Sequence, residues 1–170
     1  MSKKLMDAYS KLCDKYSFVP RLYSRVKPVM LSELMSYTHI TGIYTYFTGE
    51  ANVNVNYPDF IVVSSAAHEM AHQRGIAPEN EANFVAYLIC MESDDNYIRY
   101  SAYLNLLEYV QSTLYKADKS AYSAFSYTLG EEIYLEFRAY NAFFDEYRQN
   151  VVANVSQAVN DTYLKAQGQS

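Results

Sequence analysis

Apolar residues recur three and four positions apart along most of this chain, which is the spacing of amphipathic helices. At the N-terminal end the pattern predicts a helix over residues 4–16 and a second over residues 28–35, with Pro28 in its first turn. Beyond residue 59 the same pattern continues, and glycine, proline and aspartate divide it into segments. These segments predict further helices over residues 60–74, 78–91, 96–116, 120–129, 131–148 and 151–164.

Two short segments break the helical pattern and predict a hairpin. Residues 43–47 are rich in Tyr, Ile and Phe, and residues 52–56 alternate strictly between Asn and Val, as a half-buried strand does. Gly49 lies in the short turn between them. No repeat or linker divides the sequence, so we expect a single α+β domain over residues 1–170. It is mostly α, with a small antiparallel sheet or hairpin ahead of a long helix and a helical C-terminal part.

Composition excludes several classes of protein. Half of the residues are hydrophobic (50%), which is too many for an intrinsically disordered chain. The charge of −5, from 14 basic and 19 acidic residues, gives no basic surface for nucleic acid, so we expect no nucleic-acid partner. Two cysteines are too few for a disulfide framework. The longest apolar runs fall far short of the roughly 20 residues that span a bilayer, so we expect the chain as given to be soluble.

The residues with the clearest chemistry lie in the sequence His68-Glu69-Met70-Ala71-His72, an H-E-x-x-H motif. Histidines four residues apart lie on one face of a helix, so both imidazoles can reach one metal ion. The glutamate beside the first histidine can take a proton from a water molecule at the metal. A random chain with the three histidines and the glutamate content of this one holds about 0.003 such motifs. The motif therefore predicts a single Zn²⁺ site with Glu69 as general base.

A catalytic zinc site needs a third protein ligand, and the sequence offers two candidates for it. Gly75 and Pro78 predict a reversal of the chain that brings Glu79 and Glu81 toward the motif. We favour Glu79, because it shares a helix face with Asn83, which can orient a ligating histidine. Glu81 is the alternative. His39 is the remaining histidine, and its turn-like surroundings favour a loop residue over a ligand.

Two resemblances support this interpretation. The block 79–83 resembles the E-x-E-A-D/N element that follows H-E-x-x-H in gluzincin-type metallopeptidases, where the first glutamate binds zinc and the last residue supports a histidine. More widely, the chain resembles the DUF3810 family of bacterial zincin-like membrane proteins of unknown function. The segments that carry this second resemblance are 27–32, 34–38, 40–44, 47–54, 68–75, 79–88, 99–101 and 160–165.

The family resemblance implies a zincin-like fold and a membrane anchor. Its members usually carry transmembrane segments ahead of this region, so we expect a membrane tether outside this chain and a domain on the extracytoplasmic side. The resemblance also directs attention to the strand 52–56, because zincin folds place a substrate-pairing edge strand just before the metal helix. Asn52 and Asn54 are therefore expected substrate contacts, and Arg138, set among aromatic residues, is a candidate for stabilising an oxyanion.

Three hypotheses follow from these residues. The first is a zinc-dependent peptidase acting on a peptide or protein substrate through a metal-activated water. The second is a non-catalytic zincin-like module with a sensory or binding role, in which the metal stabilises the fold or controls partner binding. The third, weaker hypothesis is a helical protein without metal. The sequence makes no prediction of the oligomeric state.

Overall fold

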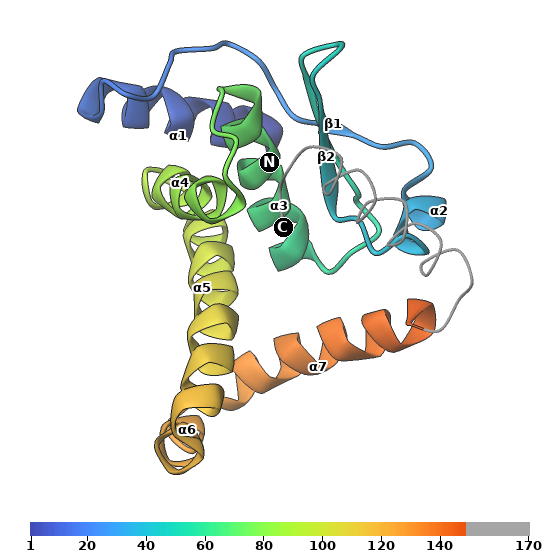
Figure 1. Cartoon of the computed structure of the whole chain (residues 1–170), viewed down its shortest axis with the longest axis vertical. Coiled ribbons are helices and arrows are strands. Elements are labelled where there is room, and N and C mark those ends of the chain that lie inside the picture. Colours follow the sequence, from blue (N-terminus) through green and yellow to red (C-terminus); the bar gives the residue numbers. More distant parts are fainter. Residues whose placement is uncertain (149–170) are drawn as a thin grey trace.

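The central helix α3 (Asp59–Gln73) organises the computed structural model, which describes residues 1–148 (Figure 1). On one side it packs against α4 (Glu79–Met91) and α5 (Asn96–Ala117), and on the other against the strands β2 (Gly42–Thr45) and β3 (Glu50–Val53). The remaining elements are α1 (Ser2–Lys15), β1 (Lys27–Pro28), α2 (Ser32–Ser36), α6 (Lys119–Ser126) and α7 (Glu131–Tyr147).

Small and apolar side chains explain the central place of α3. Ala66, Ala67 and Ala71 are fully buried and let neighbouring elements approach closely, while Phe60 and Met70 fill the core at either end. The expected helix over residues 60–74 is confirmed, since α3 begins and ends within one residue of it. The expected helices 4–16, 78–91, 96–116, 120–129 and 131–148 are likewise found as α1, α4, α5, α6 and α7, whereas 151–164 lies outside the described residues.

The sheet region corrects three expectations. It is mixed and has the strand order β1-β3-β2, so it is not the purely antiparallel sheet expected from the hairpin. β2 and β3 do form the predicted antiparallel hairpin, but Pro28 belongs to β1, which pairs in parallel with β3. The helix expected over 28–35 is reduced to the short α2, because the backbone around Pro28 is extended and pairs with Val53. β3 also ends at Val53, short of the expected strand 52–56.

Two residues reverse the chain after α3. Gly75 has a φ of 89°, the left-handed conformation in which glycine commonly ends a helix. Pro78 then immediately precedes the first turn of α4. This reversal lays α4 beside the last turns of α3 and sets the acidic first turn of α4 next to the histidine motif.

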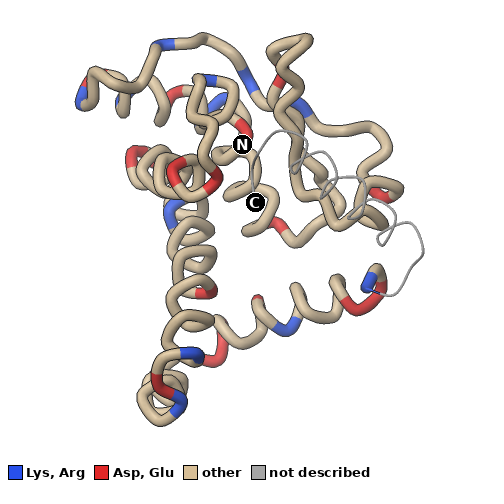
Figure 2. The backbone as a smooth tube through the Cα atoms, viewed as in Figure 1, with Lys and Arg blue, Asp and Glu red and all other residues tan. Residues whose placement is uncertain are grey.

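The outer helices are fastened at several points. Three lysines of α1 form ion pairs with acidic residues at and just after the C-terminal end of α4, as in the pair Lys11–Asp94 (Figure 2 marks the charges). The side chains of Asp95 and Asp118 cap α5 and α6, where the sequence offered Asp94 or Asp95 for the first helix and Asp118 for the second. From α6, α7 runs back across the lower side of the molecule in Figure 1. Over residues 1–148, none of the helices has the length and apolar character needed to cross a membrane.

Candidate metal centre

The two histidines of the motif meet at the C-terminal end of α3. Their Nε2 atoms lie 2.8 Å apart, and the two side chains are only 16% (His68) and 14% (His72) exposed. The four-residue spacing produces this arrangement because the rings project from successive turns of the same helix face.

A separate oxygen atom fixes the tautomer of each imidazole. His72 Nδ1 lies 2.7 Å from the carbonyl oxygen of Ile76, which can only accept, so Nδ1 carries the proton and donates it. His68 Nδ1 likewise lies 2.8 Å from Asn83 Oδ1. Both Nε2 atoms therefore present lone pairs to the same small volume, as in metal-ligating histidines.

The carboxylate of Glu79 completes the cluster from the first turn of α4. Its oxygens lie 3.1 Å from His68 Nε2 and 3.5 Å from His72 Nε2. One ligand atom from each of the three residues lies within 4.8 Å of the other two. Atoms bound about 2.0–2.1 Å from a tetrahedral ion stand about 3.3–3.4 Å apart, a value within the range of the observed separations. A set of two neutral imidazoles and a carboxylate suits zinc.

The surroundings of His68 disfavour protonation of its imidazole, so a proton is not the favoured positive charge for this cluster. Burial, followed by the nearby His72, lowers the pKa of the His68 imidazole, although Glu79 acts in the opposite direction. Three electron-pair donors thus converge with no hydrogen-bond donor among their facing atoms. This arrangement can hold a cation.

Glu69 lies beside the cluster, and its side chain is buried against Gly42 of β2. It is 6% exposed, and burial, with a smaller contribution from the negative charge of Glu79, raises the pKa of its carboxyl group to about 7. The backbone N–H of Tyr44 in β2 interacts with this carboxylate and acts against the rise in its pKa. A carboxyl group with a pKa near 7 can take up and release a proton at neutral pH.

The structure separates the two candidate third ligands. Glu79 faces the histidines, whereas Glu81 lines a surface depression with Phe18, Ile76 and Phe84. Their separation follows from helix geometry, because residues two apart point about 200° apart around the axis. Asn83 contacts His68 as expected for an orienting residue.

His39 lies away from the cluster. It lies in the turn after α2, as expected for a loop residue. There its Nε2 contacts the backbone carbonyl of Tyr147 at 2.7 Å and its ring packs on Phe144. Its φ of 59° is the only positive φ among the described non-glycine residues.

Three other expected site residues are not brought to the cluster. Asn54 is fully buried and donates to Ser36 Oγ and to the Ile40 carbonyl, so its amide holds the fold together and is not open to a substrate. Asn52 lies in β3, the central strand, which already pairs on both sides. Arg138 is exposed on α7, a helix that packs against the opposite end of α3 through the rings of Phe60 and Phe137.

Sequence reasoning missed the backbone contributors to the site. The carbonyl of Ile76 and the N–H of Tyr44 belong to groups that every residue carries, so no residue type marks them. Sequence reasoning also missed Gly42, which faces the side chain of Glu69. A glycine within a strand pattern is a signal of close approach and was available in the sequence.

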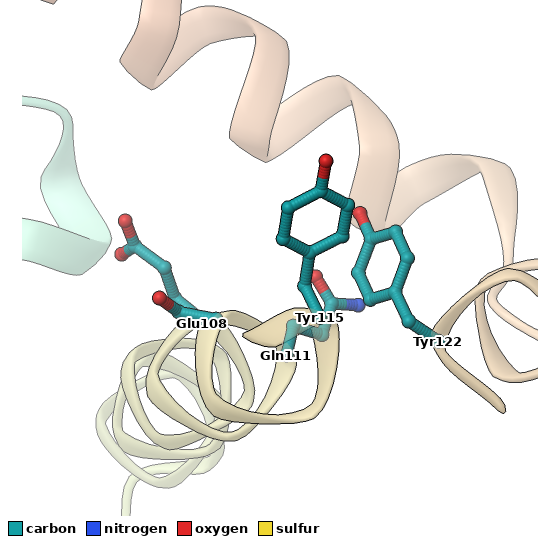
Figure 3. A pocket seen from close by; sticks show the side chains of 5 residues that line it. Glu108, Gln111, Tyr115 and Tyr122 are labelled. Carbon is teal, nitrogen blue, oxygen red and sulfur yellow. The ribbon is translucent and has the colours of Figure 1, made fainter. Parts of the chain in front are cut away.

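A second cavity, of about 290 Å³, lies between α5 and α6 on the side facing α7 (Figure 3). Tyr115 and Tyr122 point from it toward α7, and Glu108 lies at its other end. Burial raises the pKa of Glu108, but the cavity does not reach the histidine cluster.

The described molecule is thus a mostly helical α+β protein that carries a His–His–Glu cluster at the end of its central helix. The whole chain, residues 1–170, matches the model of a family described as a protein of unknown function, DUF3810, and it belongs to that family. No curated protein and no solved structure matches the chain.

Proposed function

We propose that this protein is a zinc-dependent metallopeptidase that holds one zinc ion through His68, His72 and Glu79. The observation that carries the proposal is the convergence of three electron-pair donors, with both histidine tautomers fixed from behind, beside a buried carboxylate. Zinc bound there supplies Lewis-acid activation of a water molecule and of the scissile carbonyl.

Glu69 moves the proton in this proposal. Its position next to His68 places a carboxylate beside the cluster but outside the set of ligands. It takes a proton from the attacking water and gives it to the amine that leaves when the peptide bond breaks. Its burial keeps bulk water from this carboxylate.

The open edge of β2 supports an extended peptide as the substrate. The backbone N–H of Asn54 donates to the Thr41 carbonyl at 2.9 Å, so Thr41 and Asn54 form a hydrogen-bonded pair of the hairpin. In an antiparallel pair every second residue forms such a pair, so with the observed register the next ones on β2 are Ile43 and Thr45. The backbone groups of Gly42 and Tyr44 therefore point away from β3. Among residues 1–148 no strand pairs with that edge, which leaves it open to β-strand addition.

In this proposal β2, and not the expected strand 52–56, is the edge strand that pairs with the substrate. β3 is enclosed between β1 and β2, whereas β2 is an edge strand and reaches Glu69 through Tyr44. A membrane tether outside this chain, with the domain on the extracytoplasmic side, stays part of the proposal on the family resemblance alone.

The substitution Glu69→Gln tests the proposed reaction. The variant should retain zinc, because Glu69 is not a ligand, and should cleave peptides about 10²–10⁴-fold more slowly, because the proton acceptor is gone. The assay is hydrolysis of a mixture of unstructured peptides followed by mass spectrometry, with Glu81→Gln as the matched control that keeps full activity. Retention of full activity by Glu69→Gln would refute the mechanism.

The same assay separates the peptidase from a non-catalytic module. A zinc-loaded parent protein that cleaves no peptide in the mixture, while its His72→Ala variant loses both zinc and stability, would favour a structural role for the metal.

A further inference from the structure

Gly42 is placed where no other residue fits without moving Glu69. A Cβ atom added at position 42 would lie 2.6 Å from Glu69 Cγ, 2.8 Å from Oε1 and 3.0 Å from Cδ. All three of the nearest atoms belong to that one side chain, and Cγ is near its base, so it cannot move aside without displacing the carboxylate. The backbone of Gly42 does not need glycine, since among the glycines of residues 1–148 the positive φ values belong to Gly49 and Gly75. The need for glycine here is one of space.

Two residues further along the same strand, the backbone N–H of Tyr44 interacts with the carboxylate of Glu69 and favours its charged form. This N–H is one of those that the register of the hairpin directs toward the open edge. A donor at an open edge ordinarily bonds to water. Here it interacts with a glutamate from the helix that packs against the sheet.

We propose that Gly42 and the backbone N–H of Tyr44 position Glu69, holding its carboxylate at the open edge of β2 beside the histidine cluster. The functional meaning of this arrangement rests on the proposed peptidase. An extended peptide paired with β2 would have its backbone next to the carboxylate that transfers the proton. Gly42 supplies the space and Tyr44 the hydrogen bond, so the strand that would receive the substrate also orients the base.

A double-mutant cycle measured by urea unfolding of the full chain tests the steric part. Gly42→Ala should lower the urea midpoint in the parent protein, and this loss should largely disappear in a Glu69→Ala background, where the added methyl group has room. The control cycle combines Gly42→Ala with Glu79→Ala, which removes a carboxylate that is not among the atoms nearest position 42, and should be additive. An equal loss in the parent and Glu69→Ala backgrounds would overturn the steric part.

Amide hydrogen exchange followed by NMR tests the hydrogen bond. The Tyr44 amide should exchange faster in Glu69→Ala and in Gly42→Ala than in the parent, while the Ile43 amide, which faces β3, should not change. Unchanged exchange at Tyr44 in both variants would contradict the proposal.

These two measurements need neither zinc nor activity, so they stand apart from the test of the peptidase. In a protein that proves to be a peptidase, Gly42→Ala should keep its zinc and lose about tenfold or more in kcat with KM little changed. A fall in zinc content that matches the fall in kcat would assign Gly42 to the metal site and overturn its role toward Glu69.

Discussion

Each atom of the candidate centre is held by a particular partner. The Nδ1–H groups of His68 and His72 donate to Asn83 Oδ1 and to the Ile76 carbonyl, so the two Nε2 atoms would need no rearrangement to bind a cation. Glu79 is 77% exposed and approaches from the solvent side. The two imidazoles are thus preorganised, whereas the exposed carboxylate has room to adjust its position.

Asn83→Ala tests this preorganisation at the level of one residue. Loss of the amide oxygen should weaken zinc binding about 10–100-fold, because nothing then fixes the His68 tautomer. Asn83→Asp, which keeps an acceptor at the same position, should bind zinc close to the parent value. Competition with a fluorescent zinc chelator measures both affinities.

Asn80→Ala is the matched control for that prediction. Asn80 lies on the same helix but lines the surface depression near Phe84, so its variant should bind zinc as the parent does. Equal affinities of Asn83→Ala and Asn80→Ala would show that the hydrogen bond does not orient a ligand.

At the scale of elements, the two ends of α3 differ: aromatic packing lies at its N-terminal end and the histidine cluster at its C-terminal end. At its N-terminal end Phe60 packs edge-on against Phe137 and Tyr140 of α7, and just before it Tyr57 packs on Phe143. Its C-terminal end carries the histidines and then Arg74. The buried Arg74 guanidinium donates to the carbonyls of Met70 and Leu22 and stacks 3.6 Å over the ring of Tyr9.

Tyr57, at the junction of α3 and α7, leads us to expect a loss of stability at alkaline pH. Burial raises the pKa of Tyr57 to about 12 from 10.0, so the folded protein binds this proton more tightly than the unfolded chain does. Its contribution is complete below about pH 10 and is lost as the pH rises through 12. Tyr57→Phe should therefore lose less free energy of unfolding over this range than the parent, as measured by urea titrations at a series of pH values.

Tyr127→Phe provides the comparison, because Tyr127 is 89% exposed and no buried hydroxyl is removed with it. This variant should follow the parent curve. A Tyr57→Phe curve that also coincides with the parent would mean that ionisation of this tyrosine does not drive alkaline unfolding.

At the scale of the whole molecule, local pattern predicted the helices well and the sheet only in part. Helix ends were found because Gly75, Pro78 and Asp95 act on their immediate neighbours. β1 is two residues long and pairs with a strand more than twenty positions away, so no local signal marks it. The Asn–Val alternation correctly predicted a strand with one buried and one more exposed face, but it does not show which strands pair with that strand on either side.

The candidate site divides in the same way. Glu69 and the neighbouring histidines could be predicted because the spacing of the motif directly sets how these side chains lie on the helix. Glu79 and Asn83 could be predicted because residues four apart share one face of a helix. The sequence did not reveal that Asn54 is buried, because a polar side chain in a strand serves equally well as a buried hydrogen-bonding group, and its partners lie in α2 and just after it.

The zinc content of protein purified without a histidine tag tests the central claim most directly. After saturation with zinc and removal of excess metal, elemental mass spectrometry should find about one zinc per chain in the parent and in Glu81→Gln. His72→Ala and Glu79→Gln should hold far less, because each loses one of three ligands. A parent protein without zinc, or a His72→Ala variant that holds as much as the parent, would contradict the account.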